Sequence, residues 1–251
     1  MIDTHCHLND PEAFPDPVEA IRLAKQAGVN QLIIIGVDVE SSRRALEIAD
    51  QNEGVFASIG RHPNYAQHFQ VSDLNEFESM LQHPKAVAVG EIGLDYHWDF
   101  ATKEQQFACL MPQLDLARSM QKPIIFHCRK ANDDLLKVLE SRPPHPYDFH
   151  CFSGTASDAQ RILQLDGYFG VDGPITYKKS GEYRELIANL PKDRILIETD
   201  SPYMSPEPYR GKPNSPANLP LICQCLASVW GLSAEETAHI TSENARRLFG
   251  I

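Results

Sequence analysis

Short apolar runs recur along the whole chain, and their pattern predicts buried parallel strands. The runs are continuous rather than alternating and are rich in Ile, Val and Phe, as expected of strands that are covered on both faces. Eight runs fit this description: Ile2–His5, Leu32–Gly36, Phe56–Gly60, Ala86–Gly90, Pro123–His127, Asp148–Cys151, Tyr168–Val171 and Arg194–Glu198.

Segments with helical spacing of apolar residues lie between most of these runs. Three of moderate length are Val18–Ala27, Ser41–Gln51 and Ala131–Ser141. The longest is Lys103–Gln121, where Pro112 predicts a kink or a division into two shorter helices. Ser233 and Glu236 have the spacing of a capping box, which predicts a C-terminal helix that begins there and continues through Phe249.

The alternation of eight strands with helices predicts an α/β fold of the (β/α)₈ TIM-barrel type, with residues 1–251 as a single domain. An open doubly wound sheet is the alternative. We prefer the barrel because no early strand is followed by a glycine-rich phosphate fingerprint. The irregular segment Ser201–Asn218 follows the eighth strand, so we expect an active-site loop there.

Side chains that bind metals gather where these strands end. His5 and His7 are one residue apart, so both can point the same way from the first strand. In a barrel, the carboxyl ends of all strands meet at one face, where catalytic groups lie. Six of the eight strands deliver a His or a carboxylate to that face, and the candidate ligands are His5, His7, Glu91, His127, His150 and Asp200.

The ligand types indicate which ions would bind. Mixed imidazole and carboxylate donors suit Zn²⁺, Mn²⁺, Fe²⁺ or Ni²⁺ better than the all-oxygen site that Mg²⁺ prefers, although Mg²⁺ stays among the candidates. Six ligands exceed the needs of one tetrahedral ion. We therefore expect two divalent cations roughly 3.5–4 Å apart, bridged by a carboxylate. Glu91 is the expected bridge, because its strand lies between the strands that carry the histidines.

The formal net charge of −11 argues against a broad nucleic-acid-binding surface. It leaves room for an enzyme that holds one or two phosphates through metal ions, because bound ions reverse the local charge. No stretch is apolar and long enough to cross a membrane, and the N-terminus lacks the features of a signal peptide. Six scattered cysteines predict reduced thiols in the cytoplasm, and a monomer is the default.

Taken in order, several segments resemble the TatD family of metal-dependent deoxyribonucleases, within the amidohydrolase-like barrels. No single segment is decisive, but the ordered set covers nearly the whole chain. The segments are Asp3–His7, Gly60–Pro63, Gly90–Tyr96, His127–Arg129, His150–Gly154, Glu198–Tyr203 with Arg210–Lys212, and Asn244–Phe249.

The resemblance implies a role for each matched residue. His5, His7, Glu91 and Asp200 match the ligands of a first metal, and Glu91, His127 and His150 match those of a second. Asp200 also matches the general base, and His62 matches a histidine that contacts the phosphate or the leaving group. The chain departs from the family pattern at Asn64, where a second histidine is common, and at Lys130, where Asp is common.

These observations favour hydrolysis of DNA phosphodiester bonds, acting on single strands or strand ends. Asp200, His62 and Glu91 are the expected catalytic residues, and Arg129, Arg210 and Lys212 are expected to offset charge on the phosphoryl oxygens. These three basic side chains could equally well be solvated charges at the rim of the barrel. Tyr96, Trp98 and Tyr203 are candidates for stacking on bases, and packing of loops over the barrel would explain these side chains about as well.

Two other functions remain open. The same constellation hydrolyses a small phosphate ester, an amide or a lactone in principle. Related barrels often bridge their metals with a carbamylated lysine on the fourth strand, whereas this chain has Glu91 there and Lys85 only at the start of the strand. A non-catalytic metal-binding scaffold is the third possibility, which the intact ligand set with Asp200 disfavours.

Overall fold

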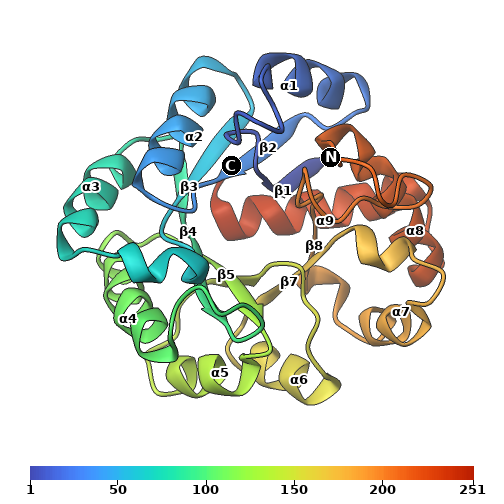
Figure 1. The fold of residues 1–251 in the computed structure, drawn as a ribbon. Helices are drawn as coiled ribbons and strands as arrows, with labels where there is room; N and C mark the ends of the chain where they lie inside the picture. Colours follow the sequence, from blue (N-terminus) through green and yellow to red (C-terminus); the bar gives the residue numbers. More distant parts are fainter.

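The computed structural model describes residues 1–251 and contains one sheet of eight parallel strands, which follow one another in sequence order. The view along the barrel in Figure 1 shows the helices as an outer ring around the strands. The predicted (β/α)₈ fold is confirmed. The strands are β1 (Ile2–Cys6), β2 (Gln31–Ile35), β3 (Val55–Ile59), β4 (Ala86–Asp95), β5 (Ile124–Arg129), β6 (Tyr147–Phe149), β7 (Tyr168–Val171) and β8 (Ile195–Ile197).

The sheet is joined to itself beyond β8, where the chain returns to β1. An isolated parallel bridge pairs Cys6 with Ser201, the Asp200 amide donates to the His5 carbonyl at 2.8 Å, and the His7 amide donates to the Ser201 carbonyl at 2.7 Å. The alternative of an open doubly wound sheet is therefore wrong. This seam also brings the loop after β8 next to the two histidines of β1.

Helices cover the outside of the barrel in the expected alternation. They are α1 (Pro17–Gln26), α2 (Val39–Gln51), α3 (Val71–Leu81), α4 (Lys103–Ser119), α5 (Asn132–Glu140), α6 (Ala156–Gln164), α7 (Gly181–Ala188), α8 (Leu219–Trp230) and α9 (Ala234–Phe249). Four 3₁₀ turns complete the set: η1 (Pro63–His68), η2 (Gly173–Thr176), η3 (Lys192–Arg194) and η4 (Pro216–Asn218).

Two expectations about these helices have opposite outcomes. The capping box at Ser233 is present and opens α9, as predicted. The division of Lys103–Gln121 into two helices is wrong, because α4 is one helix with Pro112 inside it. Buried residues on both sides of the proline, among them Cys109 and Leu114, pack against the barrel and hold the helix together despite the missing N–H.

The C-terminal helix α9 closes the end of the barrel where the strands begin. A compact apolar cluster inside the barrel contains Ile2, Ile33 and Leu196 from the strands together with Leu248 and Phe249 from α9. In Figure 1 this helix crosses behind the strands. With that end filled, the carboxyl ends of the strands form the open mouth.

The segment Ser201–Asn218 behaves as the predicted loop, with no regular element before η4. No single helix is long and apolar enough to cross a membrane; the one pair that meets such a criterion jointly, Pro216–Trp230 with Ala234–Phe249, is bent by 104°.

We predict that Leu248→Ala lowers the free energy of unfolding by about 2–5 kcal/mol, because it leaves a cavity under the barrel. Leu248 is 8% exposed within the apolar cluster. Urea denaturation measures the effect, with His239→Ala on the exposed side of α9 as the control. Equal stability of the two variants would mean that α9 does not support the barrel.

Candidate metal centre

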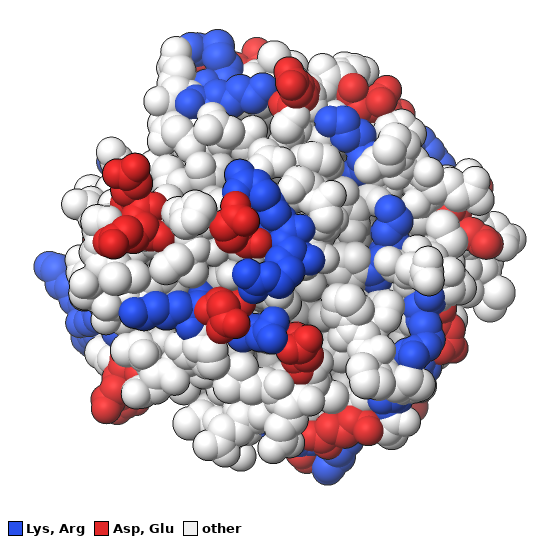
Figure 2. Space-filling model, turned by 180° about the vertical axis from the view of Figure 1, so that it is seen from behind, with Lys and Arg blue, Asp and Glu red and all other residues white.

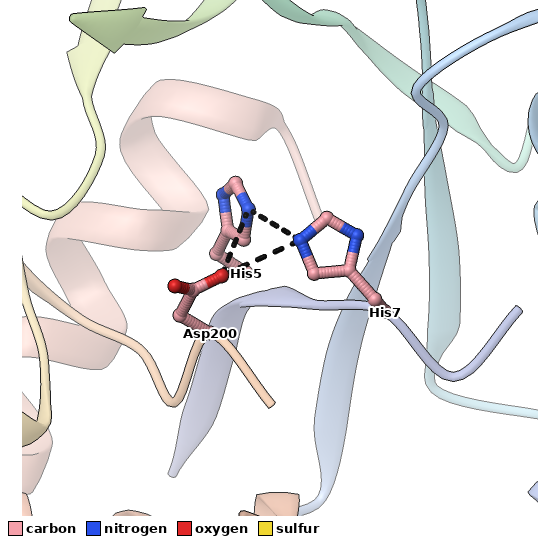
Figure 3. A group of neighbouring side chains, drawn as sticks. All are labelled: His5, His7 and Asp200. Atoms are coloured by element: carbon pink, nitrogen blue, oxygen red, sulfur yellow. Dashed lines mark hydrogen bonds and ion pairs between the residues drawn. The ribbon is translucent and has the colours of Figure 1, made fainter. Parts of the chain in front are cut away.

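His5, His7 and Asp200 meet at the seam between β1 and the loop after β8. The Nε2 atoms of His5 and His7 are 3.3 Å apart. Asp200 Oδ1 lies 3.7 Å from Nε2 of His5 and 3.4 Å from Nε2 of His7. Figure 3 shows the three side chains turned toward one common point. This is the arrangement predicted from the alternation of side chains along the first strand.

Glu91 lies at the centre of the mouth and contacts histidines from four strands or their loops. Its Oε2 is 3.5 Å from His5 Nε2. Its Oε1 is 2.9 Å from His127 Nδ1, 3.2 Å from His150 Nε2 and 3.6 Å from His62 Nε2. The two oxygens of one buried carboxylate thus face different groups of histidines, which is what a bridging ligand requires.

Two glycines allow β4 to bring Glu91 this close to β5. A Cβ on Gly90 would lie 2.7 Å from Ile125 Cβ, and a Cβ on Gly93 would lie 1.9 Å from the His127 carbonyl oxygen. Gly93 also has φ +146°, which L side chains rarely adopt. The approach of the two strands therefore depends on the absence of side chains at both positions.

Two further carboxylates orient the histidines from behind, and the sequence analysis assigned them no role. Asp95 Oδ2 lies 2.8 Å from His127 Nε2, and Glu198 Oε1 lies 3.2 Å from His150 Nδ1. The far nitrogen of each ring thus faces a carboxylate while the near one faces Glu91. Histidines that bind metals are typically held in this way. Both acids stand in the segments Gly90–Tyr96 and Glu198–Tyr203, but their register with the histidines becomes visible only in three dimensions.

Each orienting carboxylate is itself fixed. Asp95 Oδ1 accepts from the amides of His97 at 2.7 Å and Trp98 at 3.2 Å. Glu198 Oε1 accepts from the Cys151 amide at 2.7 Å. A Cβ on Gly170 would lie 2.5 Å from Glu198 Oε1, so this glycine leaves room for the carboxylate.

The carboxylates of the cluster are anionic despite their burial. Burial raises the pKa of Glu91, but His150, His62 and His5 outweigh it and hold that pKa well below its usual value. Burial also raises the pKa of Asp200, and the hydrogen bond from His7 with the nearby imidazoles lowers it overall. The carboxylate oxygens and the imidazole nitrogens lie close enough together to share an ion. This donor set fits divalent cations.

His62 differs from the other histidines. Its Nδ1 accepts from the Asn64 amide at 3.0 Å, so in the neutral ring Nε2 carries the proton and faces Glu91. Burial and neighbouring His127 lower the pKa of His62 to about 3, which keeps the ring neutral. His62 thus presents an N–H donor to the centre of the mouth.

The basic side chains that the sequence singled out occupy different places. Arg129 lines the mouth, with its guanidinium carbon 5.7 Å from the centre of the Trp98 ring. Arg210 lies over Tyr177 at 4.2 Å, and neither it nor Lys212 lines a cavity beside the cluster. Lys85 donates to the carbonyls of Asn52 and Val55, away from Glu91.

Two cavities flank the cluster, one over each half of the barrel. The first, about 840 Å³, is lined mainly by β4 and the segments that follow β1 to β4, with Tyr203 from the loop after β8. The second, about 930 Å³, is lined by the segments that follow β5 to β8 and by α7. Both cavities share four residues: His127, Arg129, His150 and Asp200. The cluster therefore stands where the two spaces meet.

Exposed aromatic side chains line the first cavity. They are Tyr65, Trp98, Phe100 and Tyr203, between 43% and 56% exposed. Trp98 and Tyr203 are where the sequence predicted stacking residues. Tyr96 lines neither cavity, because its hydroxyl donates to Asp134 at 2.8 Å. Of the two departures from the family pattern, Asn64 lines the first cavity and Lys130 lines neither.

Comparisons with known proteins identify the family of this chain. The family model "TatD related DNase" matches residues 2–250. The chain is 36% identical to the uncharacterized metal-dependent hydrolase YabD of Bacillus subtilis (strain 168), over 100% of this chain and 99% of the relative. It is 33% identical to the 3'-5' ssDNA/RNA exonuclease TatD of Escherichia coli (strain K12), over 100% and 99%.

A solved structure of YjjV, a TatD homologue from Escherichia coli K12, has a TM-score of 0.94 and 34% identity, over 100% of this chain and 98% of that one. Fold, family match and full-length relatives therefore agree, and the chain belongs to the TatD-related DNase family of metal-dependent hydrolases.

Proposed function

We propose that this enzyme hydrolyses phosphodiester bonds at the ends of single-stranded nucleic acid. The observation that carries the proposal is the cluster of imidazoles and carboxylates at the junction of two cavities, which suits a phosphate with chain on either side. The name of the Escherichia coli relative, a 3'-5' ssDNA/RNA exonuclease, supports this substrate and the direction of attack from the 3′ end.

We propose two divalent cations, with Glu91 between them. His5, His7 and Asp200 would hold the first, and His127 and His150 would hold the second. The ligand atoms of His5, His7 and Asp200 lie within 4.8 Å of one another, which supports the first set, because one cation can contact all three. Bound divalent ions supply charge that lowers the pKa of a water and offsets the charge of a phosphate.

Asp200 is the proposed general base. Its lowered pKa keeps it able to accept a proton at neutral pH. The water oxygen attacks phosphorus, the bond from phosphorus to the leaving sugar oxygen breaks, and that oxygen takes up a proton. His62 donates its Nε2–H to a phosphoryl oxygen, and Arg129 approaches from the rim. Arg210 and Lys212 stay predictions for more distant phosphates.

The aromatic side chains of the first cavity would stack on successive bases. Stacking tolerates any sequence, because every base presents a π-face. It also suits a protein with few basic groups at its mouth. Figure 2 shows that Lys and Arg gather, among Asp and Glu, near the middle of the face opposite to the view of Figure 1.

We propose further that residues 1–251 act as one domain, as a monomer in the cytoplasm. All six cysteines are free, which supports a reducing compartment.

We predict metal-dependent removal of nucleotides from the 3′ end. The test uses single strands labelled at the 5′ or the 3′ end, after chelation and re-addition of Mg²⁺, Mn²⁺ or Zn²⁺. Asp200→Asn should lower kcat by about 10²–10⁴-fold, because the proton acceptor is lost. His127→Ala should abolish restoration by metal. No cleavage with any metal would shift the substrate to a small ester or amide.

Asp95→Asn should weaken metal binding by about 10–100-fold, because it removes the carboxylate that orients His127. Calorimetric titration of the metal-free protein measures the affinity. Asp99→Asn, at an exposed position in the loop that follows β4, is the matched control. An unchanged affinity in Asp95→Asn would show that Asp95 does not position a ligand.

Trp98→Ala should raise KM for single strands by about 5–150-fold with little change in kcat, because a stacking surface of about 1–3 kcal/mol is lost. Tyr209→Ala is the control, since Tyr209 is 43% exposed but lines neither cavity. Equal KM values for the two variants would contradict a stacking role.

A further inference from the structure

The second cavity has a different character from the first. None of its lining residues is among the large exposed hydrophobic side chains of the molecule. Its apolar wall includes Phe152, which is 4% exposed, together with Pro174, Leu186 and Met204. A space of about 930 Å³ that is walled in this way suits one compact ligand rather than an extended strand.

The wall between the loops after β7 and β8 is closely packed. A Cβ on Gly173 would lie 1.7 Å from the Met204 carbonyl oxygen, so the two loops touch through backbone alone. Phe152 packs edge to face against Phe169 of β7, with ring centres 4.9 Å apart. The cavity is therefore held in shape by the barrel itself.

Two polar groups of this cavity lack partners. Asp172, 1% exposed, has its Oδ2 buried without a hydrogen bond, and the hydroxyl of Tyr183 is likewise buried and unpartnered. Buried polar groups in folded proteins are almost always hydrogen-bonded, because leaving one unpaired costs about 1–3 kcal/mol. Two such groups in one cavity indicate a ligand that brings its own donors and acceptors.

The charge of the cavity restricts that ligand. Arg129 is its only Lys or Arg, and it stands at the shared junction. The acidic side chains along it are Asp172, Glu182 and Glu185. Burial, with Glu198 and Asp200 nearby, holds the pKa of Asp172 well above its usual value, so the negative charge of this space comes from the exposed Glu182 and Glu185. A phosphate beyond the junction would meet this charge and no basic side chain, so the ligand carries its phosphate at the junction and is uncharged beyond it.

We propose that the second cavity binds the terminal nucleoside of the strand, with Asp172 and Tyr183 hydrogen-bonding its base or sugar. This inference rests on the proposed function. With the scissile phosphate at the junction, the terminal nucleoside occupies one side, and the strand continues over the aromatic side chains of the first cavity. The cavity thus selects ends, since an interior nucleotide would bring a second phosphate among the carboxylates.

The test compares 3′-terminal modifications of one single-stranded oligonucleotide with the metal-loaded enzyme. Removing the terminal base should lower kcat/KM for the first cleavage by about tenfold or more, whereas an abasic position four nucleotides inward should change it less than about twofold. A 3′-terminal phosphate should also lower it by about tenfold or more, through repulsion by the carboxylates. Equal rates on all these substrates would overturn the proposal.

A variant ties the effect to the cavity. Tyr183→Phe should lower kcat/KM on the intact strand but have little effect on the strand without its terminal base. Tyr177→Phe, which alters a tyrosine outside both cavities, is the matched control. If Tyr183→Phe lowered kcat/KM equally for the two substrates, the hydroxyl would not contact the terminal nucleoside.

Binding provides a readout that does not depend on cleavage. Calorimetry should show that a nucleoside 5′-monophosphate binds metal-loaded enzyme about tenfold or more tighter than 2-deoxyribose 5-phosphate, and that Tyr183→Phe reduces this difference. Cleavage without any preference for a terminal base would refute the cavity assignment and leave the nuclease intact. Absence of cleavage would refute the nuclease, and equal binding of the two phosphates would then refute the nucleoside site as well.

Discussion

The buried carboxylate of Glu91 is the constraint on which the mouth of this barrel depends. Taking an isolated carboxylate out of water is costly, and such a group normally becomes neutral. Here His5, His62, His127 and His150 surround it at 2.9–3.6 Å and keep it charged. The strands must therefore present these rings at one point, and the glycines of β4 allow them to do so.

Neighbouring imidazoles in this cluster divide the charge between them. The rings of His62 and His127 have their centres 4.2 Å apart, too close for both to be cationic at little cost. Burial lowers the pKa of His127, but the hydrogen bonds to Asp95 and Glu91 raise it overall. Burial and the neighbouring His127 lower the pKa of His62. Burial, and after it the neighbouring His127, therefore keeps the His62 ring a neutral donor, while Asp95 and Glu91 favour the charged form of His127.

The sequence was sufficient for the fold because its strands are buried on both faces and therefore appear as continuous apolar runs. The prediction was least complete for β4, expected to end at Gly90 but extending to Asp95. Beyond Gly90 the charged residues Glu91 and Asp95 face the mouth among apolar neighbours, so the apolar run ends before the strand does. The convergence of His5, His7, Glu91, His127, His150 and Asp200 was predictable, since the carboxyl ends of parallel strands meet at one face.

Contacts that depend on three-dimensional register were not predictable. Asp95 and Glu198 act on histidines 32 and 48 positions away in sequence, and no spacing rule connects them. The division of the mouth into two cavities likewise depends on how far each loop reaches, as does the turn of Tyr96 toward Asp134. Arg210 lies in a segment that matches the family, yet its guanidinium packs over the ring of Tyr177.

One consequence follows from the presence of a single Lys or Arg side chain, Arg129, along both cavities. Each phosphate neutralised by a side chain contributes about −0.7 to the slope of log affinity against log salt for single strands. The side chains of this mouth would thus cost the enzyme only about fivefold in affinity over a tenfold rise in ionic strength. In the proposed complex, binding of a strand would therefore depend on aromatic surface and bound cations, and the side chains of the mouth would make it less sensitive to salt than the binding of a basic nuclease.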